Sequence, residues 1–169
     1  MCLFQCERVR FAEDAKPITV YKYLIKTNDG RYISPYYGYD FQWEEGKTYK
    51  VGGAGPDEVG HSLYKELSEG DYRDLITGPA YHSYKWRYDA GKMGYWTYEN
   101  DPVPIREGHH SLVVGEFEIP VDSEYVYLGT DNATYIEAYA SSALKFNRII
   151  EEIDEDFNLE KFNDRRFVF

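Results

Sequence analysis

Tyrosine is the side chain on which this sequence most depends for a folded core. Leu, Ile, Val and Phe, which usually fill a core, number 9, 10, 10 and 9 among 169 residues, close to the level at which disorder is expected. Eighteen tyrosines add enough apolar area to predict a folded domain. Because each tyrosine also carries a hydroxyl group, we expect an aromatic core whose hydroxyls find hydrogen-bond partners at its edges.

Acidic side chains outnumber basic ones and gather in the second half of the chain. The net charge is −11, and residues 151–169 alone carry seven acidic and three basic side chains. Such a field repels phosphate backbones, so we expect no direct binding of nucleic acid. A surface that only keeps the protein soluble is one interpretation, and a site for a basic protein partner is another.

The two cysteines, Cys2 and Cys6, indicate thiols in a reducing compartment. Two ligands do not complete a zinc site, and no pair of His or Cys residues follows at zinc-finger spacing. No apolar run is long enough for a membrane span, and no charged-then-apolar start resembles a signal peptide. We therefore expect a cytoplasmic protein with no membrane contact and no metal.

Residues 18–34 give the clearest structural signal in the chain, that of a β-hairpin. Residues 18–25 are rich in β-branched and aromatic types, which favour a strand. Asn28, Asp29 and Gly30 then form a tight-turn signal, and residues 31–34 resume the strand pattern.

The rest of the chain reads as short strands with two helices. Further strands are expected at 48–51, 81–88, 111–119, 124–128 and 133–138, with 143–150 as a strand or a buried helix, 57–68 and 151–163 as helices, and 89–110 as loop with a short strand at 95–98. The economical interpretation is a single α+β domain with a mainly antiparallel sheet and a few helices. Its core would span 18–150, after an N-terminal arm at 1–17 and before an acidic helical segment at 151–169.

Two titratable residues stand out as candidates for chemistry. His82 lies at the start of a predicted strand, where a histidine can titrate or bond to a ligand, although a hydrogen-bonded interior histidine is the plainer interpretation. Glu137 is flanked by bulky side chains that could desolvate it and raise its pKa, whereas a solvated strand face would leave it unperturbed.

The tyrosine-rich stretch 36–43 is the best candidate for a binding surface. Tyrosine and tryptophan supply broad contact area with little loss of conformational entropy. We expect an interface built from Tyr36, Tyr37, Tyr39 and Trp43. The alternative is an aromatic loop that folds back onto the sheet.

An ordered series of short motifs runs along the middle of the chain. It consists of Ile18-Thr19-Val20-Tyr21-Lys22, Tyr32-Ile33-Ser34-Pro35-Tyr36, Gly46-Lys47-Thr48-Tyr49, Tyr81-His82-Ser83-Tyr84, Glu118-Ile119-Pro120, Tyr125-Val126-Tyr127-Leu128-Gly129 and Ala140-Ser141-Ser142. The series resembles a group of small proteins of bacteriophages and gut Bacteroidetes. The resemblance implies an intracellular phage or mobile-element context, and no particular reaction.

The order of Lys22, Ser34 and Glu137 is similar to that of site residues in ADP-ribosyltransferase folds. That resemblance implies a site for a nicotinamide dinucleotide, with His82 as an alternative member. The family usually has Arg at the first position, Ser-Thr-Ser at the second and an acid or amide two residues before the last. This chain has Lys22, Ser34-Pro35 and Tyr135 there.

The sequence leaves three functions open. The leading prediction is a protein-binding module that engages a host or phage protein through a tyrosine-rich acidic surface and needs no cofactor. The second is a transferase-like enzyme or nucleotide binder that uses Lys22, Ser34, His82 or Glu137. The third is an acidic mimic of nucleic acid. Convergence of Lys22, His82 and Glu137 on one cleft would favour the second function.

Overall fold

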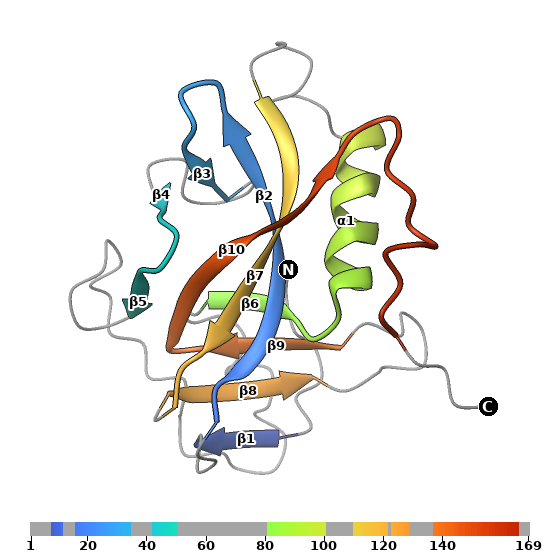
Figure 1. Cartoon of the computed structure of the whole chain (residues 1–169). Helices are drawn as coiled ribbons and strands as arrows, with labels where there is room; N and C mark the ends of the chain where they lie inside the picture. The colour runs from blue at the N-terminus through green and yellow to red at the C-terminus, as the bar shows by residue number, and fades with distance from the viewer. Residues whose placement is uncertain are drawn as a thin grey trace.

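One antiparallel sheet with a single helix makes up the part of the chain that the structure describes (Figure 1). The structure is a computed structural model, and it describes residues 8–11, 16–34, 42–50, 81–100, 110–121, 123–128 and 137–165. The sheet has ten strands, and all of their pairings are antiparallel. An α+β architecture with a mostly antiparallel sheet is thus confirmed for these residues.

The strands follow one another in the order β1-β8-β9-β6-β2-β7-β10-β5, with β3 pairing to β2 and β4 pairing to β3. Their bounds are β1 Arg8–Phe11, β2 Ile18–Thr27, β3 Tyr32–Ile33, β4 Gln42–Trp43, β5 Thr48–Lys50, β6 Tyr81–Tyr84, β7 His110–Ile119, β8 Glu124–Leu128, β9 Ala138–Ser141 and β10 Ala143–Ile153, and the helix α1 is Arg87–Asn100. The central pair is β2 with β7, which runs in unbroken register from Ile18 opposite Ile119 to Thr27 opposite His110.

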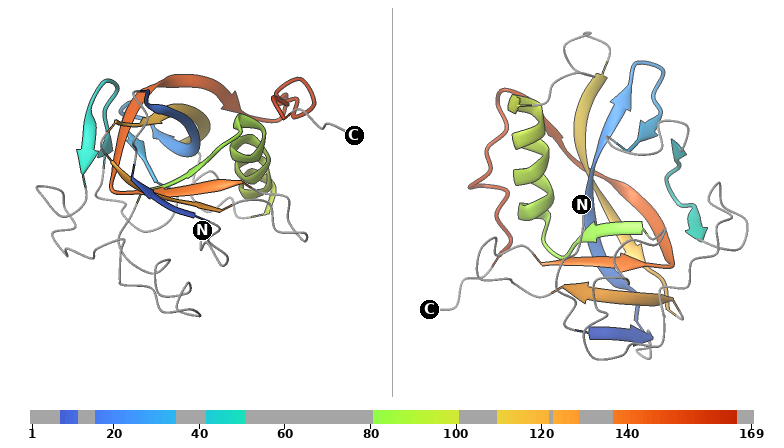
Figure 2. Two further views of the ribbon diagram at one scale, coloured as in Figure 1. Left: turned by 90° about the horizontal axis from the view of Figure 1, so that it is seen from below. Right: turned by 180° about the vertical axis from the view of Figure 1, so that it is seen from behind.

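The sheet is strongly bent around this central pair. In Figure 1, α1 lies on one side of β2 and β7, whereas β3, β4 and β5 lie on the other, and the rear view in Figure 2 agrees. Strands β6, β9, β8 and β1 run across the lower end of β2. Two register shifts interrupt the pairing of β10 with β7, after Phe146 and after Ile149, and such bulges bend a strand.

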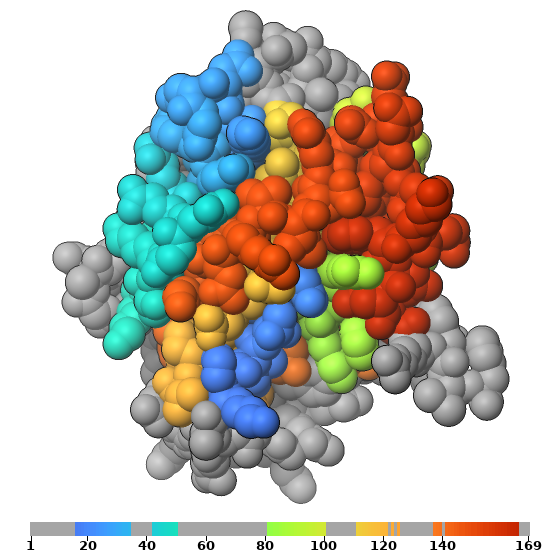
Figure 3. All heavy atoms as spheres, viewed as in Figure 1, coloured from blue at the N-terminus to red at the C-terminus, as the bar shows by residue number. Residues whose placement is uncertain are grey.

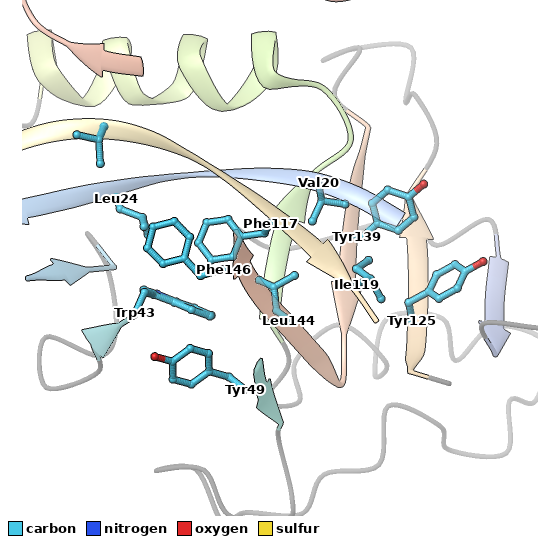
Figure 4. Close-up of a cluster of buried hydrophobic side chains, with 11 residues drawn as sticks. Val20, Leu24, Trp43, Tyr49, Phe117, Ile119, Tyr125, Tyr139, Leu144 and Phe146 are labelled. Atoms are coloured by element: carbon cyan, nitrogen blue, oxygen red, sulfur yellow. The ribbon is translucent and has the colours of Figure 1, made fainter. Parts of the chain in front are cut away.

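Two hydrophobic clusters lie on opposite faces of β2 and β7. The helix-side cluster contains Ile25, Ile33, Tyr84, Ala90, Leu112, Val114, Ala138, Ile153 and Phe162. The aromatic cluster contains Val20, Leu24, Trp43, Tyr49, Val113, Phe117, Ile119, Tyr125, Tyr139, Leu144 and Phe146 (Figure 4). Three buried tyrosines therefore belong to the aromatic cluster, as the composition predicted. The hydroxyl of Tyr49 donates to the carbonyl oxygen of Gln42 at 2.9 Å, so this tyrosine finds its partner at the edge of the core.

The hairpin predicted over residues 18–34 is confirmed. Ile25 pairs with Ile33, and the chain reverses between β2 and β3 through a turn closed by a bond from the Gly30 amide to the Thr27 carbonyl at 3.0 Å. Gly30 has a φ of +83°, a conformation that L side chains rarely adopt. A glycine at this position therefore suits the tight turn that the sequence predicted.

The helix α1 corrects the prediction for residues 81–110. The predicted strand ends at Tyr84, and residues 87–100 are helical instead of continuing as strand and loop, so the short strand predicted at 95–98 is also wrong. The buried side of α1 is made of small or polar residues, namely Asp89, Ala90, Gly91, Gly94 and Thr97. These residues fall at helical spacing but are not apolar enough to produce the usual amphipathic pattern.

The segment after β10 corrects the prediction of an acidic terminal helix. Residues 143–153 form a strand, which resolves the alternative left open for 143–150, and residues 154–165 continue as turns and extended chain with no helix. This segment, the tail, packs along α1, where it brings Phe162 against Gly91. In Figure 3, β10 and the tail spread in orange and red across one face of the molecule.

Two other expectations concern the flanks of the sheet. Arg8–Phe11, inside the predicted arm, forms β1 and pairs with β8, so it is part of the sheet. The helix predicted at 57–68 lies outside the described residues, and of the strand predicted at 133–138 the structure describes only the last two residues, with β9 beginning at Ala138.

Candidate functional site

Lys22 lies on the central strand and points toward the aromatic cluster. Side chains alternate along a strand, and Val20 and Leu24 on either side of Lys22 are both fully buried in that cluster. Lys22 itself is partly buried. A lysine at this position is unusual, because a strand with one face on an apolar core normally carries apolar residues at each alternate position.

The Lys22 amine is held by a backbone carbonyl and an aromatic ring. Its Nζ donates a hydrogen bond to the carbonyl oxygen of His82, and it lies 5.8 Å from the centre of the Trp43 ring. Within the part of the chain that the structure describes, no carboxylate forms an ion pair with it. Burial lowers the pKa of Lys22 to about 8, since the charged form loses hydration without gaining a counter-ion.

His82 and Ser83, on β6, add two buried polar groups beside this amine. Among the described residues, neither the Nδ1 of His82 nor the Oγ of Ser83 has a hydrogen-bond partner. Burial, and then the nearby Lys22 charge, lower the pKa of His82 to about 3, so its imidazole is neutral. The pairing of Tyr21 with Tyr84 places Ser83 next to Lys22 in the following step of the antiparallel register.

Trp43 belongs to the core. Its side chain is 3% exposed, and its ring lies edge-on at 4.9 Å from that of Tyr49 and at 5.1 Å from that of Phe117 (Figure 4). For this residue the structure favours the alternative interpretation, an aromatic side chain folded back onto the sheet. The other three residues of the predicted interface, Tyr36, Tyr37 and Tyr39, lie outside the described residues.

Ser34 is linked to Lys22 through the Trp43 side chain. The indole Nε1 of Trp43 donates to the Ser34 Oγ at 3.1 Å, while the face of the same ring lies under the Lys22 amine. The structure therefore brings Lys22, His82 and Ser34 into one neighbourhood around the Trp43 ring.

Glu137 is engaged elsewhere. Its carboxylate accepts a hydrogen bond from the Trp86 Nε1 at 2.9 Å and pairs with the Lys85 Nζ at 3.0 Å. Both partners come from the short connection between β6 and α1. Among the described residues, no hydrogen bond or ion pair joins Glu137 to Lys22 or His82.

A second cluster, on the surface, was not singled out by the sequence. Three partly exposed aromatic rings meet where α1 contacts the tail: the Tyr95 ring stacks on that of Tyr98 at 6.1 Å and contacts that of Phe157 at 5.9 Å. Hydrogen bonding to Glu99 raises the pKa of Tyr95. Glu155 and Asp156, directly before Phe157, are exposed and make no ion pair with any described residue.

We call this cluster the α1–tail surface, and it comprises Tyr95, Tyr98, Glu99, Glu155, Asp156 and Phe157. The sequence contains its parts in two segments, an aromatic run at 95–98 and an acidic run at 151–156. Only the packing of the tail on α1 brings them together. The apolar residue Phe157, directly after the acidic run, is the one signal that points to such packing.

Hydrogen bonds and an ion pair attach the tail to the start of α1. The two carboxylate oxygens of Asp164 accept hydrogen bonds from the backbone amides of Arg87 and Tyr88, each at 3.1 Å, which caps the helix. Arg165 pairs with the buried Asp89 at 3.3 Å. The second carboxylate oxygen of Asp89 has no partner among the described residues, and burial raises the pKa of Asp89 to about 6 against the opposing effect of Arg165.

Comparison of the chain with protein-family models, with curated proteins and with solved structures finds no match in any of the three. Within the described ranges, no helix has the length and apolar character needed to cross a membrane. In the same ranges, no three side chains of His, Cys, Asp or Glu lie close enough together to hold a metal ion.

Proposed function

We propose that this chain is a protein-binding module whose α1–tail surface takes a basic segment of a partner protein. The observation that carries the proposal is a cluster of partly exposed aromatic rings, one of which directly follows two exposed carboxylates that have no ion-pair partner among the described residues. Tyr95 stacks on Tyr98 and touches Phe157, and Glu155 and Asp156 stand directly beside Phe157. The resemblance to phage proteins suggests a host or phage protein as the partner.

This combination suits arginine better than other side chains. A guanidinium group stacks on an aromatic face while its edge donates hydrogen bonds to a carboxylate, and both interactions grow stronger as water is excluded. Aromatic residues are also frequent where binding energy is concentrated. The net charge of −11 would speed the approach of a basic partner.

The tail already packs on α1 in the structure of the chain alone. Asp164 caps α1 and Arg165 is buried against Asp89, so the tail is fixed on the helix just after the acidic residues. A surface that is already ordered loses less conformational entropy on binding. The observation therefore supports a preformed site more than a segment that folds on contact.

The transferase-like alternative receives less support. It requires Glu137 and Lys22 to face one ligand, but the Glu137 carboxylate is bound by Trp86 and Lys85. No basic side chain or glycine-rich loop among the described residues forms a cradle for a pyrophosphate near Lys22. We therefore propose no cofactor and no turnover of a nicotinamide dinucleotide.

Affinity capture with matched charge variants tests the proposal. The double substitution Glu155→Lys and Asp156→Lys changes the charge of the α1–tail surface, and Glu44→Lys with Glu45→Lys makes the same change at the exposed turn between β4 and β5. We expect a partner protein that the unmodified chain and the Glu44/Glu45 variant retain and that the Glu155/Asp156 variant loses. Retention should fall as the salt concentration rises.

Two outcomes would contradict the proposal. Equal loss of the partner in both variants would show that only the net charge matters. Retention in both would place the interface elsewhere. Displacement of the captured protein by added DNA would instead favour the third function, an acidic mimic of nucleic acid.

A further inference from the structure

The amine of Lys22 is held by a hydrogen bond but has no carboxylate counter-ion among the described residues. It donates to the carbonyl oxygen of His82, and its ordinary counter-ion, a carboxylate, is absent among the described residues. This arrangement differs from that of Lys85 and Lys145, whose amines pair with Glu137 and Glu118 at 3.0 and 3.5 Å. A carboxylate stabilises the protonated form of a lysine amine. A carbonyl oxygen, in contrast, accepts a hydrogen bond from the neutral amine as well as from the charged one.

The lone pair of that neutral amine stays free for reaction. A neutral amine that donates one N–H to the His82 carbonyl still has its lone pair directed away from that bond. The Trp43 ring, 5.8 Å from Nζ, supplies a flat apolar wall beside it. Lys22 is only partly buried, so part of its side chain keeps contact with solvent.

Unfilled hydrogen-bonding capacity next to the amine points to a polar ligand atom. Ser83 is 1% exposed, its Oγ lacks a partner among the described residues, and the register places it beside Lys22. Buried hydroxyl groups are normally hydrogen-bonded. An oxygen atom of a ligand placed at the Lys22 amine would supply the partner that Ser83 lacks.

We propose that Lys22 is an imine-forming lysine that takes aldehydes or ketones, with aromatic carbonyl compounds favoured by the Trp43 ring. The nitrogen lone pair attacks the carbonyl carbon and forms a C–N bond, giving a carbinolamine. One amine hydrogen moves to the carbonyl oxygen as the carbinolamine forms. The hydroxyl group then leaves as water with the remaining N–H hydrogen, and a C=N bond remains. No electrons are exchanged, and the chain and the carbonyl compound are the only reactants. The proposal is independent of the α1–tail surface.

The expected selectivity follows from two opposing effects. At pH 7.5 an amine with a pKa of about 8 is roughly one-quarter neutral, whereas an ordinary lysine is only about 0.1% neutral. The lower basicity also weakens the nucleophile, by a factor of roughly 20 if amines follow the Brønsted slope of about 0.5 known for thiols. A net advantage of about tenfold for Lys22 remains.

Labelling of the intact chain with pyridoxal tests this proposal. Cyanoborohydride traps the imine as a stable secondary amine, and mass spectrometry then identifies the modified lysine. Lys26 is the internal control, because it lies on the same strand four residues later and is exposed. At pH 7.5 we expect Lys22 to be labelled about tenfold faster than Lys26, with a rate that levels off above pH 8.

Three comparisons decide the result. Labelling in urea should remove the preference for Lys22, because the fold creates it. The Lys22→Arg variant should lose only the fast-reacting site and keep slow labelling of the other lysines. Labelling of Lys22 no faster than that of Lys26, or a rate that keeps rising to pH 10 at both residues, would overturn the proposal.

Discussion

The Nζ of Lys22 donates a hydrogen bond to the carbonyl oxygen of His82, sixty residues further along the chain. This bond joins the central strand β2 to β6 at the point where the sheet bends. It ties a charged side chain to the core, and the bond to a neutral carbonyl does not offset the hydration that the amine loses on burial. The stability of the fold should therefore depend on the charge of Lys22.

Stability should rise with pH in the range where Lys22 loses its proton. Its pKa is about 8 in the folded protein and about 10.5 when unfolded. Between these values the unfolded chain binds more protons, so the free energy of unfolding should increase from pH 8 to pH 10.5, by about 3 kcal/mol. Urea unfolding of the unmodified chain and of Lys22→Met at pH 7 and pH 10 measures the effect.

The Lys22→Met variant should be the more stable of the two at pH 7, and the difference should shrink by pH 10. The matched control is Lys26→Met, at an exposed position on the same strand, and this variant should keep the rise in stability from pH 7 to pH 10 that the unmodified chain shows. If the free energies of unfolding of Lys22→Met and the unmodified chain differ by the same amount at pH 7 and pH 10, the Lys22 amine is hydrated in the folded state.

Asp89 should make the free energy of unfolding fall as the pH rises, in a lower pH range than that of Lys22. Its pKa is about 6 in the folded protein, above the ordinary value of 3.8, because burial outweighs the attraction of Arg165. Between pH 4 and pH 6 the folded protein binds more protons, so stability should fall as the pH rises, by about 2 to 3 kcal/mol. Asp89→Asn should remove this slope in urea unfolding.

The exposed Asp156 provides the control for that experiment. Asp156→Asn should leave the slope between pH 4 and pH 6 in place. If Asp89→Asn keeps the slope, or if stability increases with pH in this range for both variants, then the pair with Arg165 outweighs the effect of burial.

Gly91 is required because the tail packs directly on it. A Cβ atom there would lie 2.8 Å from the Phe162 Cδ1 and 2.9 Å from the Phe157 Cζ. Alanine favours a helix by about 1 kcal/mol over glycine, but overpacking costs about 1–3 kcal/mol, so we expect Gly91→Ala to lower the unfolding free energy by about 1 kcal/mol. Lys92→Ala, on the exposed side of α1, should be nearly neutral in the same chemical denaturation experiment.

Substitutions at Gly30 in the hairpin turn measure the energetic cost of its backbone conformation without any steric clash. Gly30 has a φ of +83°, and a Cβ at this position would meet no atom within 4 Å. Gly30→Val should therefore destabilise the fold through the left-handed conformation only, by about 1–2 kcal/mol. Gly30→Asn should cost clearly less, because asparagine tolerates this conformation. Equal thermal melting of both variants would show that the turn changes shape to accept them.

Local sequence signals predicted the strands whose side chains alternate clearly. The hairpin at 18–34 and the strand at 111–119 were predicted because β-branched residues and turn residues act over a few positions. The helix at 87–100 was not, because glycine and threonine fill its buried face. Its packing against aromatic rings of the tail replaces the apolar stripe that sequence patterns detect.

The candidate sites were less predictable than the fold, because their residues meet only through long-range packing. His82 was singled out by its residue type at the start of a strand, and Lys22 by the resemblance to transferase folds. Nothing local indicates that one would bond to the backbone of the other. Trp43 was predicted on the surface from its tyrosine-rich neighbours. Its burial depends on β4, whose two residues are placed by β3 and by Tyr49.

The cap that Asp164 places on α1 also orders events during synthesis. The ribosome releases residues 87–100 well before residue 164, so the first turn of α1 emerges with its amides unsatisfied. Strand β10, which separates β7 from β5, is also among the later segments to appear. A nascent chain that has not yet released residue 164 therefore holds an incomplete sheet and an uncapped helix, and it exposes apolar surface of the kind that favours aggregation.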